Sequence, residues 1–453
     1  MNILWFQRDL RLADHAPLQA AIEAGQPLLL LYCYEPALLS EGHFNPRHGR
    51  FIMESLQNLN SILKNSGIVL HVFRNDFLAV LKKIHRRYGV GCVFSYRERG
   101  LNVLEHRNAA IEAFCDENEI QWHASEPLEE LPLAADWKKF WQKEMKKPVM
   151  IPDLSKLKPA SVSIGFIEEL AVIDTPDHYH IPDFHFQRGG PEQAEDWLNS
   201  FLKIRAVQYL EADNNPYLSR YNASRLSPYI SWGNISVRQV FQASQQAMKE
   251  GFYPKALKEF LTHLYKRDHI LFTTHQGYAC DSEDLGTTAD ENQQRLFDRW
   301  KTGTLGFPLV DAAMRCLLET GYLIPRLRSL LRSVLKQRLP EFEARGLCWL
   351  AQHSLDFEPR LFYYYASQPL GSRTFLNPVK ESHTMPSSIH FMRIWLPELV
   401  ALPPRFLHEP WLLKRADQNR YSVWLGSSYP VPPKEWIPRR MRKKKLQSRL
   451  LSS

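Results

Sequence analysis

The stretch with the clearest chemistry is Ser224-Arg225-Leu226-Ser227-Pro228, in which two hydroxyl side chains flank an arginine just before a proline. Proline suits the first turn of a helix. Hydroxyls, backbone N–H groups and a guanidinium at a helix start can together bind a phosphate or a diphosphate. A serine N-cap beside a surface arginine gives the same pattern, and on local chemistry alone it is the more ordinary interpretation because such caps are common. The stretch therefore indicates either an anion site or a helix cap.

The elements that must position this stretch begin with a domain of mixed type over residues 1–125. Short apolar runs alternate there with amphipathic stretches, which is typical of a parallel, doubly wound sheet. The pattern predicts strands at 3–6, 28–34, 68–73, 90–96 and 120–123, and helices at 16–24, 47–65, 76–88 and 102–118. Neither of the standard glycine-rich phosphate-binding motifs follows any of these strands. The sheet could still bind a ligand at its carboxyl edge, but the sequence does not identify that ligand.

The rest of the chain changes character twice. Residues 126–188 carry recurrent prolines and little regular periodicity, which predicts a connector with a short helix near 137–146. From 189 to 438 the apolar positions mostly repeat every 3.6 residues. The predicted fold class is thus α/β followed by all-α: an N-terminal doubly wound parallel sheet, a connector, a C-terminal helical domain and a basic tail at 439–453.

The net charge of +8 comes almost entirely from that tail. The segment 439–449 carries seven positive charges and no negative one, which leaves a charge of about +1 for the rest of the chain. A tail of this kind could contact nucleic-acid phosphates. It could equally be a solvated end.

The composition excludes several classes of protein. Hydrophobic residues make up 44% of the chain and charged residues 23%, which is ordinary for a globular protein and not for a disordered one. No run reaches the ~18 apolar residues of a membrane-spanning helix, and the first residues lack the basic start of a secretory signal. The six cysteines form no Cys-x-x-Cys pair, so we expect no metal site. We expect a cytoplasmic protein with no membrane partner, in which Cys33, Cys92 and Cys316 are buried, reduced thiols.

Five stretches, in order along about 400 residues, resemble the DNA photolyase/cryptochrome family of flavoproteins. They are Trp5-Phe6-Gln7-Arg8-Asp9-Leu10-Arg11-Leu12-Ala13-Asp14, Gly189-Gly190 leading to Trp197, the run from Ser224 to Ser236, Gly306-Phe307-Pro308-Leu309-Val310-Asp311-Ala312-Ala313-Met314-Arg315, and Asn377-Pro378 leading to Trp395-Leu396-Pro397-Glu398-Leu399. The chain looks like a divergent branch of that family. The resemblance implies FAD, bound in a bent form inside the helical domain.

The resemblance also assigns eight residues to the cofactor. Ser224, Arg225, Leu226 and Ser227 would contact the diphosphate, and Arg267, Arg328, Asp356 and Glu358 match positions that line the cofactor in the family. An Arg328–Asp356 pair would stabilise a reduced, anionic flavin. The alternative for this pair is a structural salt bridge between two helices.

The chain departs from the family where the lesion and the electron donors are expected. His263 stands in place of the lesion-binding glutamate, and Lys266 replaces the tryptophan that stacks on the lesion, a platform worth ~1–3 kcal/mol per base. We take His263 as the candidate catalytic residue because it could donate a proton or a hydrogen bond; its alternative is a packed, partly buried side chain. Ala366 replaces the first electron-donating tryptophan. The neighbouring run 363–365, three tyrosines, is either redox-active or part of the core.

The resemblance implies a light-driven DNA repair enzyme, a carbon–carbon lyase of the photolyase type. In such an enzyme the pyrimidine dimer is flipped out of the damaged DNA into a pocket. A reduced flavin then passes an electron to the dimer. The alternative is a cryptochrome-like photoreceptor or redox sensor that binds FAD and repairs nothing. A second, antenna chromophore is possible in the family, and Glu98, Glu105 and Arg107 lie in the region that would hold it. Charged pairs on a helix are, however, usually solvated.

Overall fold

The computed structural model describes residues 1–126, 136–170, 179, 183, 185–274, 290–368 and 376–437. The chain divides into two compact units, each described here by itself. Unit 1 comprises Met1–Val207, Ser224–Cys280 and Ala351–Ser367, and unit 2 comprises Gln208–Ala223, Asp281–Leu350 and Gln368–Ser453. These units group residues differently from the predicted ranges 1–125, 126–188 and 189–438, which stay a prediction.

Unit 1 begins with a five-stranded parallel sheet in the order β3-β2-β1-β4-β5. Its strands are β1 (Asn2–Phe6), β2 (Leu28–Cys33), β3 (Leu70–Phe73), β4 (Cys92–Tyr96) and β5 (Gln121–Ser125). In the central register Asn2 pairs with both Leu28 and Cys92. Every residue of β1 and β2 is buried, which explains why these strands are unbroken apolar runs rather than alternating ones.

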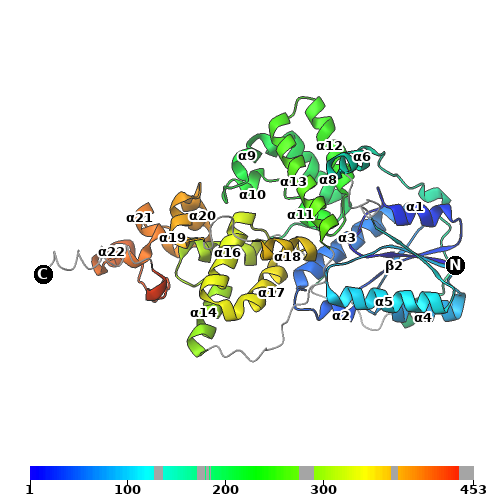
Figure 1. The fold of residues 1–453 in the computed structure, drawn as a ribbon, viewed down its shortest axis with the longest axis horizontal. Helices are drawn as coiled ribbons and strands as arrows, with labels where there is room; N and C mark the ends of the chain where they lie inside the picture. Colours follow the sequence, from blue (N-terminus) through cyan, green and yellow to red (C-terminus); the bar gives the residue numbers. More distant parts are fainter. Residues whose placement is uncertain are drawn as a thin grey trace. The chain divides into compact units, whose positions relative to one another are not determined.

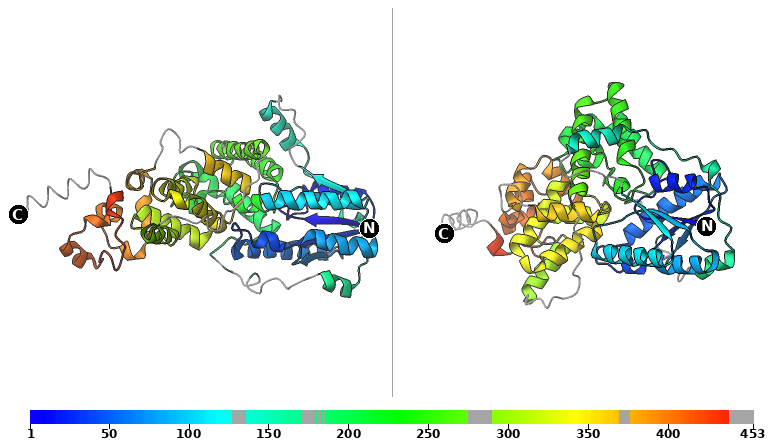
Figure 2. Two further views of the ribbon diagram at one scale, coloured as in Figure 1. Left: turned by 60° about the horizontal axis from the view of Figure 1, so that its bottom comes forward. Right: turned by 45° about the vertical axis from the view of Figure 1, so that its right-hand side comes forward.

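Helices cover both faces of this sheet (Figures 1 and 2). They are α1 (Ala16–Glu23), α3 (Pro46–Lys64), α4 (Phe77–Tyr88) and α5 (Asn102–Glu117). The short helix α2 (Pro36–Leu39) follows β2 and has no buried residue. Figure 1 shows α1 on one side of the strands and α4 and α5 on the other. On the α4 side the core joins apolar residues of the strands to those helices, with the Trp5 and Phe77 rings stacked at 3.8 Å.

Three short helices of unit 1 come from the described part of the connector. They are α6 (Trp137–Lys146), the 3-10 turn η1 (Leu154–Lys156) and α7 (Ile164–Leu170). The predicted helix at 137–146 is confirmed. The sequence analysis did not predict α7, whose Phe166 and Leu170 complete the core on the α4 side of the sheet.

Unit 1 also contains helices from after the connector. They are α8 (Pro191–Lys203), α11 (Ser227–Ser231), α12 (Val237–Lys249), α13 (Pro254–Thr273) and α18 (Pro359–Ser367). A capping box at Ser236 and Gln239 fixes the start of α12. Helix α12 packs on α6, α8 and α13, and α13 packs on α18.

In the described part of unit 2 the secondary structure is helical, apart from an isolated β-bridge between Leu425 and Tyr429. Its elements are α9 (Tyr209–Ala212), α10 (Ser219–Asn222), α14 (Glu291–Lys301), α15 (Pro308–Thr320), α16 (Pro325–Arg338), η4 (Pro340–Phe342), α19 (Pro378–Thr384), α20 (Ser388–Trp395), η5 (Pro397–Leu399), α21 (Pro404–His408), η6 (Pro410–Leu412), α22 (Arg415–Tyr421) and η7 (Lys434–Trp436). Helix α17 (Glu343–His353) begins in unit 2 and ends in unit 1. The central helix is α15, which packs on α16, α19 and α20.

A buried carboxylate organises the start of α15. Asp311 is fully buried and accepts hydrogen bonds from the backbone N–H groups of Leu305 and Gly306 at 2.7 and 2.8 Å, and from the Tyr429 hydroxyl at 2.5 Å. Burial raises the pKa of Asp311 to about 6. The stretch Gly306–Arg315 thus begins in a hydrogen-bonded turn and continues into α15.

The fold class predicted from the sequence is confirmed: a doubly wound parallel sheet is followed by helices. The predicted strands and helices of residues 1–125 are present, with boundaries displaced by no more than about two residues, as is usual for element ends. None of the helices in the described part of the chain combines the length and apolar character that crossing a membrane requires. The predicted buried thiols Cys33, Cys92 and Cys316 are buried and free. The basic tail at 439–453 lies outside the described residues.

Candidate functional site

Arg225 shapes the turn that precedes α11. Its backbone is left-handed, with φ 56°. Its Nε donates to Gln187 Oε1 at 3.1 Å, and Gln187 Nε2 donates back to the Arg225 carbonyl at 2.8 Å. Its guanidinium lies 5.9 Å from the centre of the Trp197 ring. These contacts fix Arg225 within unit 1, so that the serines on either side of it are presented by a rigid turn.

The two serines of this turn have different environments. The Ser224 carbonyl accepts a hydrogen bond from Arg205 at 3.1 Å, and its hydroxyl accepts one from the Leu226 N–H at 3.4 Å. Within the described part of the chain, neither the hydroxyl nor the backbone N–H of Ser227 has a hydrogen-bond partner. Leu226 is fully buried and anchors the turn in the core. Two hydroxyls and an uncommitted N–H are donors that suit a diphosphate, so this part of the site fits FAD.

The far end of α11 is attached to the loop after β1. The Leu10 N–H donates to the Trp232 carbonyl at 3.3 Å, and Asn234 Nδ2 donates to the Leu10 carbonyl at 3.1 Å. Gly233 has φ 72°, and a Cβ atom there would lie 2.3 Å from the Arg8 carbonyl oxygen. Only glycine permits this approach without strain. The motif at residues 5–14 therefore holds the candidate diphosphate turn through the end of α11.

On α13, Arg267 belongs to a buried hydrogen-bonded group. Its NH1 donates to Asp268 Oδ1 at 2.9 Å, and Trp141 Nε1 of α6 donates to Asp268 Oδ2 at 2.8 Å. Asp268 is 3% exposed, and burial raises its pKa while the adjacent guanidinium opposes the shift. The connector thus helps to fix the arginine that the resemblance assigns to the cofactor.

His263 lies one helical turn before Arg267 on the same helix, because residues four apart share a face. Its side chain is 35% exposed, and its Nε2 lies 3.6 Å from Glu259 Oε1. A histidine with this exposure is open to a partner from solution rather than enclosed in the core.

The acidic pair expected at the flavin follows α17 in unit 1. Glu358 is 8% exposed, and its carboxylate accepts hydrogen bonds from the Leu361 N–H at 2.8 Å and from Arg360 Nε at 3.4 Å. Glu358 therefore caps the start of α18. Asp356 is half-buried, and its carbonyl accepts a hydrogen bond from the Ser231 hydroxyl at 3.1 Å.

Arg328 lies on α16 in unit 2, where its Nε donates to the Leu323 carbonyl at 2.9 Å. Asp356 belongs to unit 1. Because each unit is described by itself, the Arg328–Asp356 pair stays a prediction.

Of the three tyrosines of α18, Tyr363 and Tyr364 are partly buried and Tyr365 is exposed. The Tyr363 hydroxyl is hydrogen-bonded to His43 Nε2, and its ring lies 5.4 Å from that of Phe362. Tyr364 and Tyr365 lie 5.5 Å apart, and Tyr365 is 56% exposed. A redox role for these tyrosines stays a prediction.

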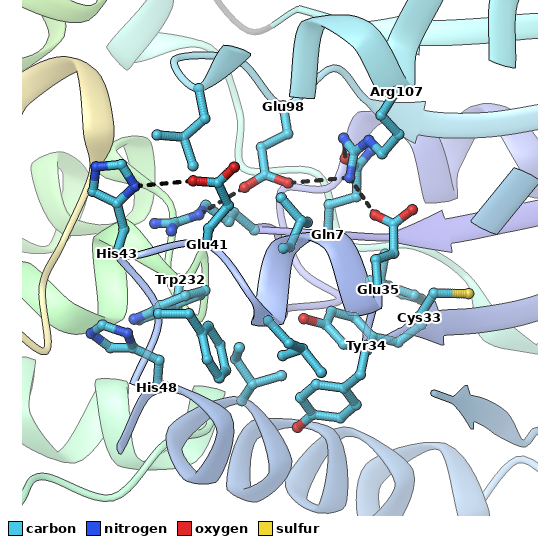
Figure 3. A pocket seen from close by; sticks show the side chains of 18 of the residues that line it. Gln7, Cys33, Tyr34, Glu35, Glu41, His43, His48, Glu98, Arg107 and Trp232 are labelled. Carbon is cyan, nitrogen blue, oxygen red and sulfur yellow. Dashed lines mark hydrogen bonds and ion pairs between the residues drawn. The ribbon is translucent and has the colours of Figure 1, made fainter. Parts of the chain in front are cut away.

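A cavity lies within unit 1 at the carboxyl ends of the strands (Figure 3). The central strand β1 has β4 as its neighbour, and the position between them is the topological switch point at which open α/β sheets bind ligands. The walls of the cavity combine aromatic and imidazole rings with charged side chains. The lining includes Trp5, Arg8, Tyr32, Tyr34, Glu35, His43, Phe44, His48, Glu98, Arg107, Trp232 and Phe357.

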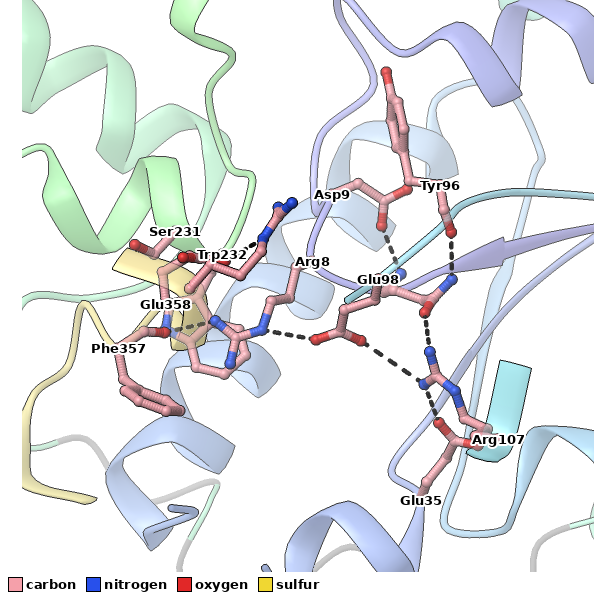
Figure 4. Close-up of polar contacts among 12 residues, drawn as sticks. Arg8, Asp9, Glu35, Tyr96, Glu98, Arg107, Ser231, Trp232, Phe357 and Glu358 are labelled. Carbon is pink, nitrogen blue, oxygen red and sulfur yellow. Dashed lines mark hydrogen bonds and ion pairs between the residues drawn. The ribbon is translucent and has the colours of Figure 1, made fainter. Parts of the chain in front are cut away.

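Paired charges run along the cavity (Figure 4). Arg107 contacts Glu35 at 2.6 Å, Gln7 at 2.6 Å and Glu98 at 3.7 Å, and Glu98 contacts Arg8 at 2.8 Å. Burial raises the pKa of Glu35, and the Arg107 guanidinium opposes the shift. The guanidiniums of Arg8 and Arg107 thus neutralise the carboxylates of Glu35 and Glu98, and Glu41 is a third carboxylate in the lining.

The sequence identified only part of this cavity. Glu98 and Arg107, expected near an antenna chromophore, do line it; Glu105 is not among the lining side chains in the described part of the chain. Arg8 and Glu35 were not singled out. A signal was present, since Arg8, Glu35 and Glu98 each stand two residues after a strand ends, where side chains converge in a parallel sheet.

Two family models match the chain: that of DNA photolyase over residues 2–127 and that of the FAD-binding domain of DNA photolyase over residues 256–447. Cryptochrome DASH of Gloeobacter violaceus is 27% identical, with 95% of this chain and 92% of the relative covered. A deoxyribodipyrimidine photo-lyase of Alkalihalophilus pseudofirmus is 26% identical, with 95% and 94% covered. The crystal structure of a Synechocystis cryptochrome superposes with a TM-score of 0.81 at 25% identity, covering 95% of this chain and 96% of that one. The chain belongs to the DNA photolyase/cryptochrome family and carries its FAD-binding domain.

Proposed function

We propose that this protein is an FAD-dependent, light-driven DNA repair enzyme that reverses pyrimidine dimers. The observation that carries the proposal is the placement of His263 one turn from Arg267 on α13. The residue at the lesion-binding position and a residue assigned to the cofactor therefore share one helix face. The partial exposure of His263 leaves it open to a base that has been flipped out of the duplex.

Each part of the site has a distinct task in this proposal. Ser224 and Ser227 bind the diphosphate, and Arg267, fixed by Asp268, places a positive charge at the cofactor. When bound, FAD supplies the light absorption and the electron that splits the dimer. His263 donates a hydrogen bond to the flipped pyrimidine.

A photoreceptor without repair activity is the second candidate. Lys266 in place of the stacking tryptophan favours it, because the lesion loses an aromatic surface worth ~1–3 kcal/mol per base. An ammonium group can instead contact a DNA phosphate, which adds salt-dependent affinity. An affinity for damaged DNA that falls steeply as the salt concentration rises would therefore favour the repair enzyme. A protein that does not bind damaged DNA would favour the photoreceptor.

The test is a repair assay on the FAD-loaded, chemically reduced protein. An oligonucleotide with a cyclobutane dimer and one with a (6-4) product are illuminated with the protein or kept with it in the dark. We expect light-dependent loss of the lesion, weakened in His263→Ala and retained in Glu259→Ala, which replaces the partner of His263 one turn away. FAD-loaded protein that leaves both lesions intact in light would favour the photoreceptor.

We also place a second, light-harvesting chromophore in the cavity of unit 1. The support is its position at the switch point of the sheet, its ring-lined wall and its neutralised charges, which suit a planar, largely apolar ligand. Protein purified from its native host should show an absorption band beyond those of FAD, and Glu35→Ala should reduce that band without loss of FAD. A spectrum of FAD alone would contradict this placement.

A further inference from the structure

The segment that joins α17 to α18 is held by an unusual set of hydrogen bonds. Five consecutive backbone carbonyls, those of residues 353 to 357, each accept a hydrogen bond from a side chain elsewhere in unit 1. The donors are Arg47 NH1 to residue 353 at 2.9 Å, His48 Nε2 to 354 at 2.9 Å, Trp232 Nε1 to 355 at 2.9 Å, the Ser231 hydroxyl to 356 at 3.1 Å and Arg8 NH1 to 357 at 2.6 Å.

These donors come from three elements that are remote in sequence. Arg8 follows β1, Arg47 and His48 open α3, and Ser231 and Trp232 end α11. The contact between Arg8 and the residue 357 carbonyl spans 349 positions of the chain. The Ser354 carbonyl also accepts a backbone hydrogen bond, from the Phe357 N–H at 3.0 Å, so the His48 imidazole is a second donor to it.

Burial makes hydrogen bonds to these carbonyls important for stability. Ser354 is 1% exposed, Leu355 2% and Phe357 2%, so their carbonyls are shielded from water. A buried carbonyl without a partner destabilises the folded state by the full cost of its desolvation. The five side chains therefore determine where this backbone runs.

The position of the backbone determines the position of two acidic side chains. Asp356 is one of the five residues, and Glu358 follows directly and caps α18. Arg8 also lies 4.0 Å from the centre of the Trp232 ring, which joins two of the donors to each other (Figure 4). Neither Arg8 nor His48 is among the residues that the family resemblance assigns to FAD.

We infer that Arg8 and His48 are positioning residues, which set the positions of Asp356 and Glu358 by holding the carbonyls of the 353–357 segment. The inference rests on the proposed function, in which FAD is bound, and on the family resemblance, which assigns these two acids to the cofactor. His48 is neutral at physiological pH, because burial lowers its pKa to about 3. It therefore presents Nε2–H as a stable donor to the carbonyl of Ser354.

The experiment compares two substitutions at His48 in the full chain. His48→Phe keeps an aromatic ring and removes the donor, whereas His48→Gln keeps an N–H donor and removes the ring. The matched control is Asn60→Ala: Asn60 lies on the same helix and also donates to a carbonyl, that of Leu70 on β3, at 2.9 Å. Three readouts are used: hydrogen–deuterium exchange of a peptide over 354–362 without FAD, the Kd for FAD, and the reduction potential of bound FAD.

We expect His48→Phe to speed exchange of the 354–362 peptide several-fold, to raise the Kd for FAD about 5-fold, the equivalent of one net hydrogen bond, and to shift the potential. His48→Gln should restore all three readouts toward the wild type. Asn60→Ala should lower stability and leave all three unchanged. If His48→Phe does not fold, Ser231→Ala, which removes one donor hydroxyl, takes its place with the same expectations.

Two controls separate this inference from the proposed function. Asp356→Asn and Glu358→Gln should change the Kd or the potential of bound FAD. If they do and His48→Phe or Ser231→Ala does not, the two acids line the flavin but the inference is overturned. If the acid variants also leave FAD unaffected, the proposed flavin site and the inference both fail. Unchanged exchange of the 354–362 peptide in either donor variant would overturn the inference by itself.

Discussion

Protonation of the unfolded chain at His48 should make this protein sensitive to acid. His48 is 1% exposed, and burial lowers its pKa from an ordinary value of about 6.5 to about 3. As the pH falls below 6.5, the unfolded chain binds a proton at this imidazole and the folded chain does not. The contribution of His48 to stability is therefore complete at pH 7 and is lost progressively as the pH falls from about 6.5 to about 3.

The size of the effect follows from the same numbers. Each pH unit within this window changes the free energy of unfolding by about 1.4 kcal/mol per group. Between pH 7 and pH 5 the change is therefore about 2 kcal/mol. His43, whose pKa burial lowers to about 4, titrates in the same direction, but it is present in both proteins compared and its effect cancels. The difference between the wild type and His48→Gln isolates one imidazole.

Urea denaturation at pH 7 and pH 5, at constant ionic strength and monitored by tryptophan fluorescence, measures this difference. We expect the wild type to lose about 2 kcal/mol more stability than His48→Gln on going from pH 7 to pH 5. Asn60→Ala, on the same helix and without a titrating group, should show the full loss of the wild type. Equal losses in the wild type and His48→Gln would refute the reasoning, because they would mean that His48 titrates alike in both states.

Three other substitutions test separate parts of the structure. Tyr429→Phe removes a hydrogen bond to the buried carboxylate of Asp311 and should lower the free energy of unfolding by roughly 1–3 kcal/mol; a urea midpoint equal to that of the wild type would contradict the buried network. Gly233→Ala adds a clash to a left-handed backbone and should lower the free energy of unfolding more than Gly251→Ala does. At Gly251 φ is 91°, but no atom lies within 4 Å of the added carbon. Equal denaturation midpoints for the two variants would show that the close approach at Gly233 is relaxed in solution. Ser227→Ala should raise the Kd for FAD about 5-fold by loss of one hydroxyl donor, and an unchanged Kd in a fluorescence titration would remove Ser227 from the diphosphate site.

The sheet could be predicted because its strands are buried on both faces. A strand such as β2, with every residue buried, must be a continuous apolar run, and a run of six bounded by amphipathic helices is recognisable without any partner. Helix α7 was not predicted because it is short and set in proline-rich sequence. Only its packing against the core, through Phe166 and Leu170, stabilises it.

The site was harder to predict because its contacts are long-range. The sequence indicated that Arg225 could bind a phosphate, but not that Gln187, 38 positions earlier, would hold its Nε and carbonyl. It also gave no sign that Arg8 would reach the carbonyl of residue 357. The spacing of residues along the chain predicts which side chains are neighbours on one helix or strand. The contacts of Arg225 with Gln187, and of Arg8 with residue 357, form only in the tertiary fold.

Arg8, His48 and Trp232 each do two things: they hold the 353–357 segment, and they form part of the wall of the cavity in unit 1. A molecule that moves these side chains on entering the cavity also moves the acids that follow them. By thermodynamic reciprocity, FAD would then alter the affinity of that molecule by the same factor by which the molecule alters the affinity for FAD. A ligand in the cavity of unit 1 would then change the affinity of the FAD site through these shared side chains.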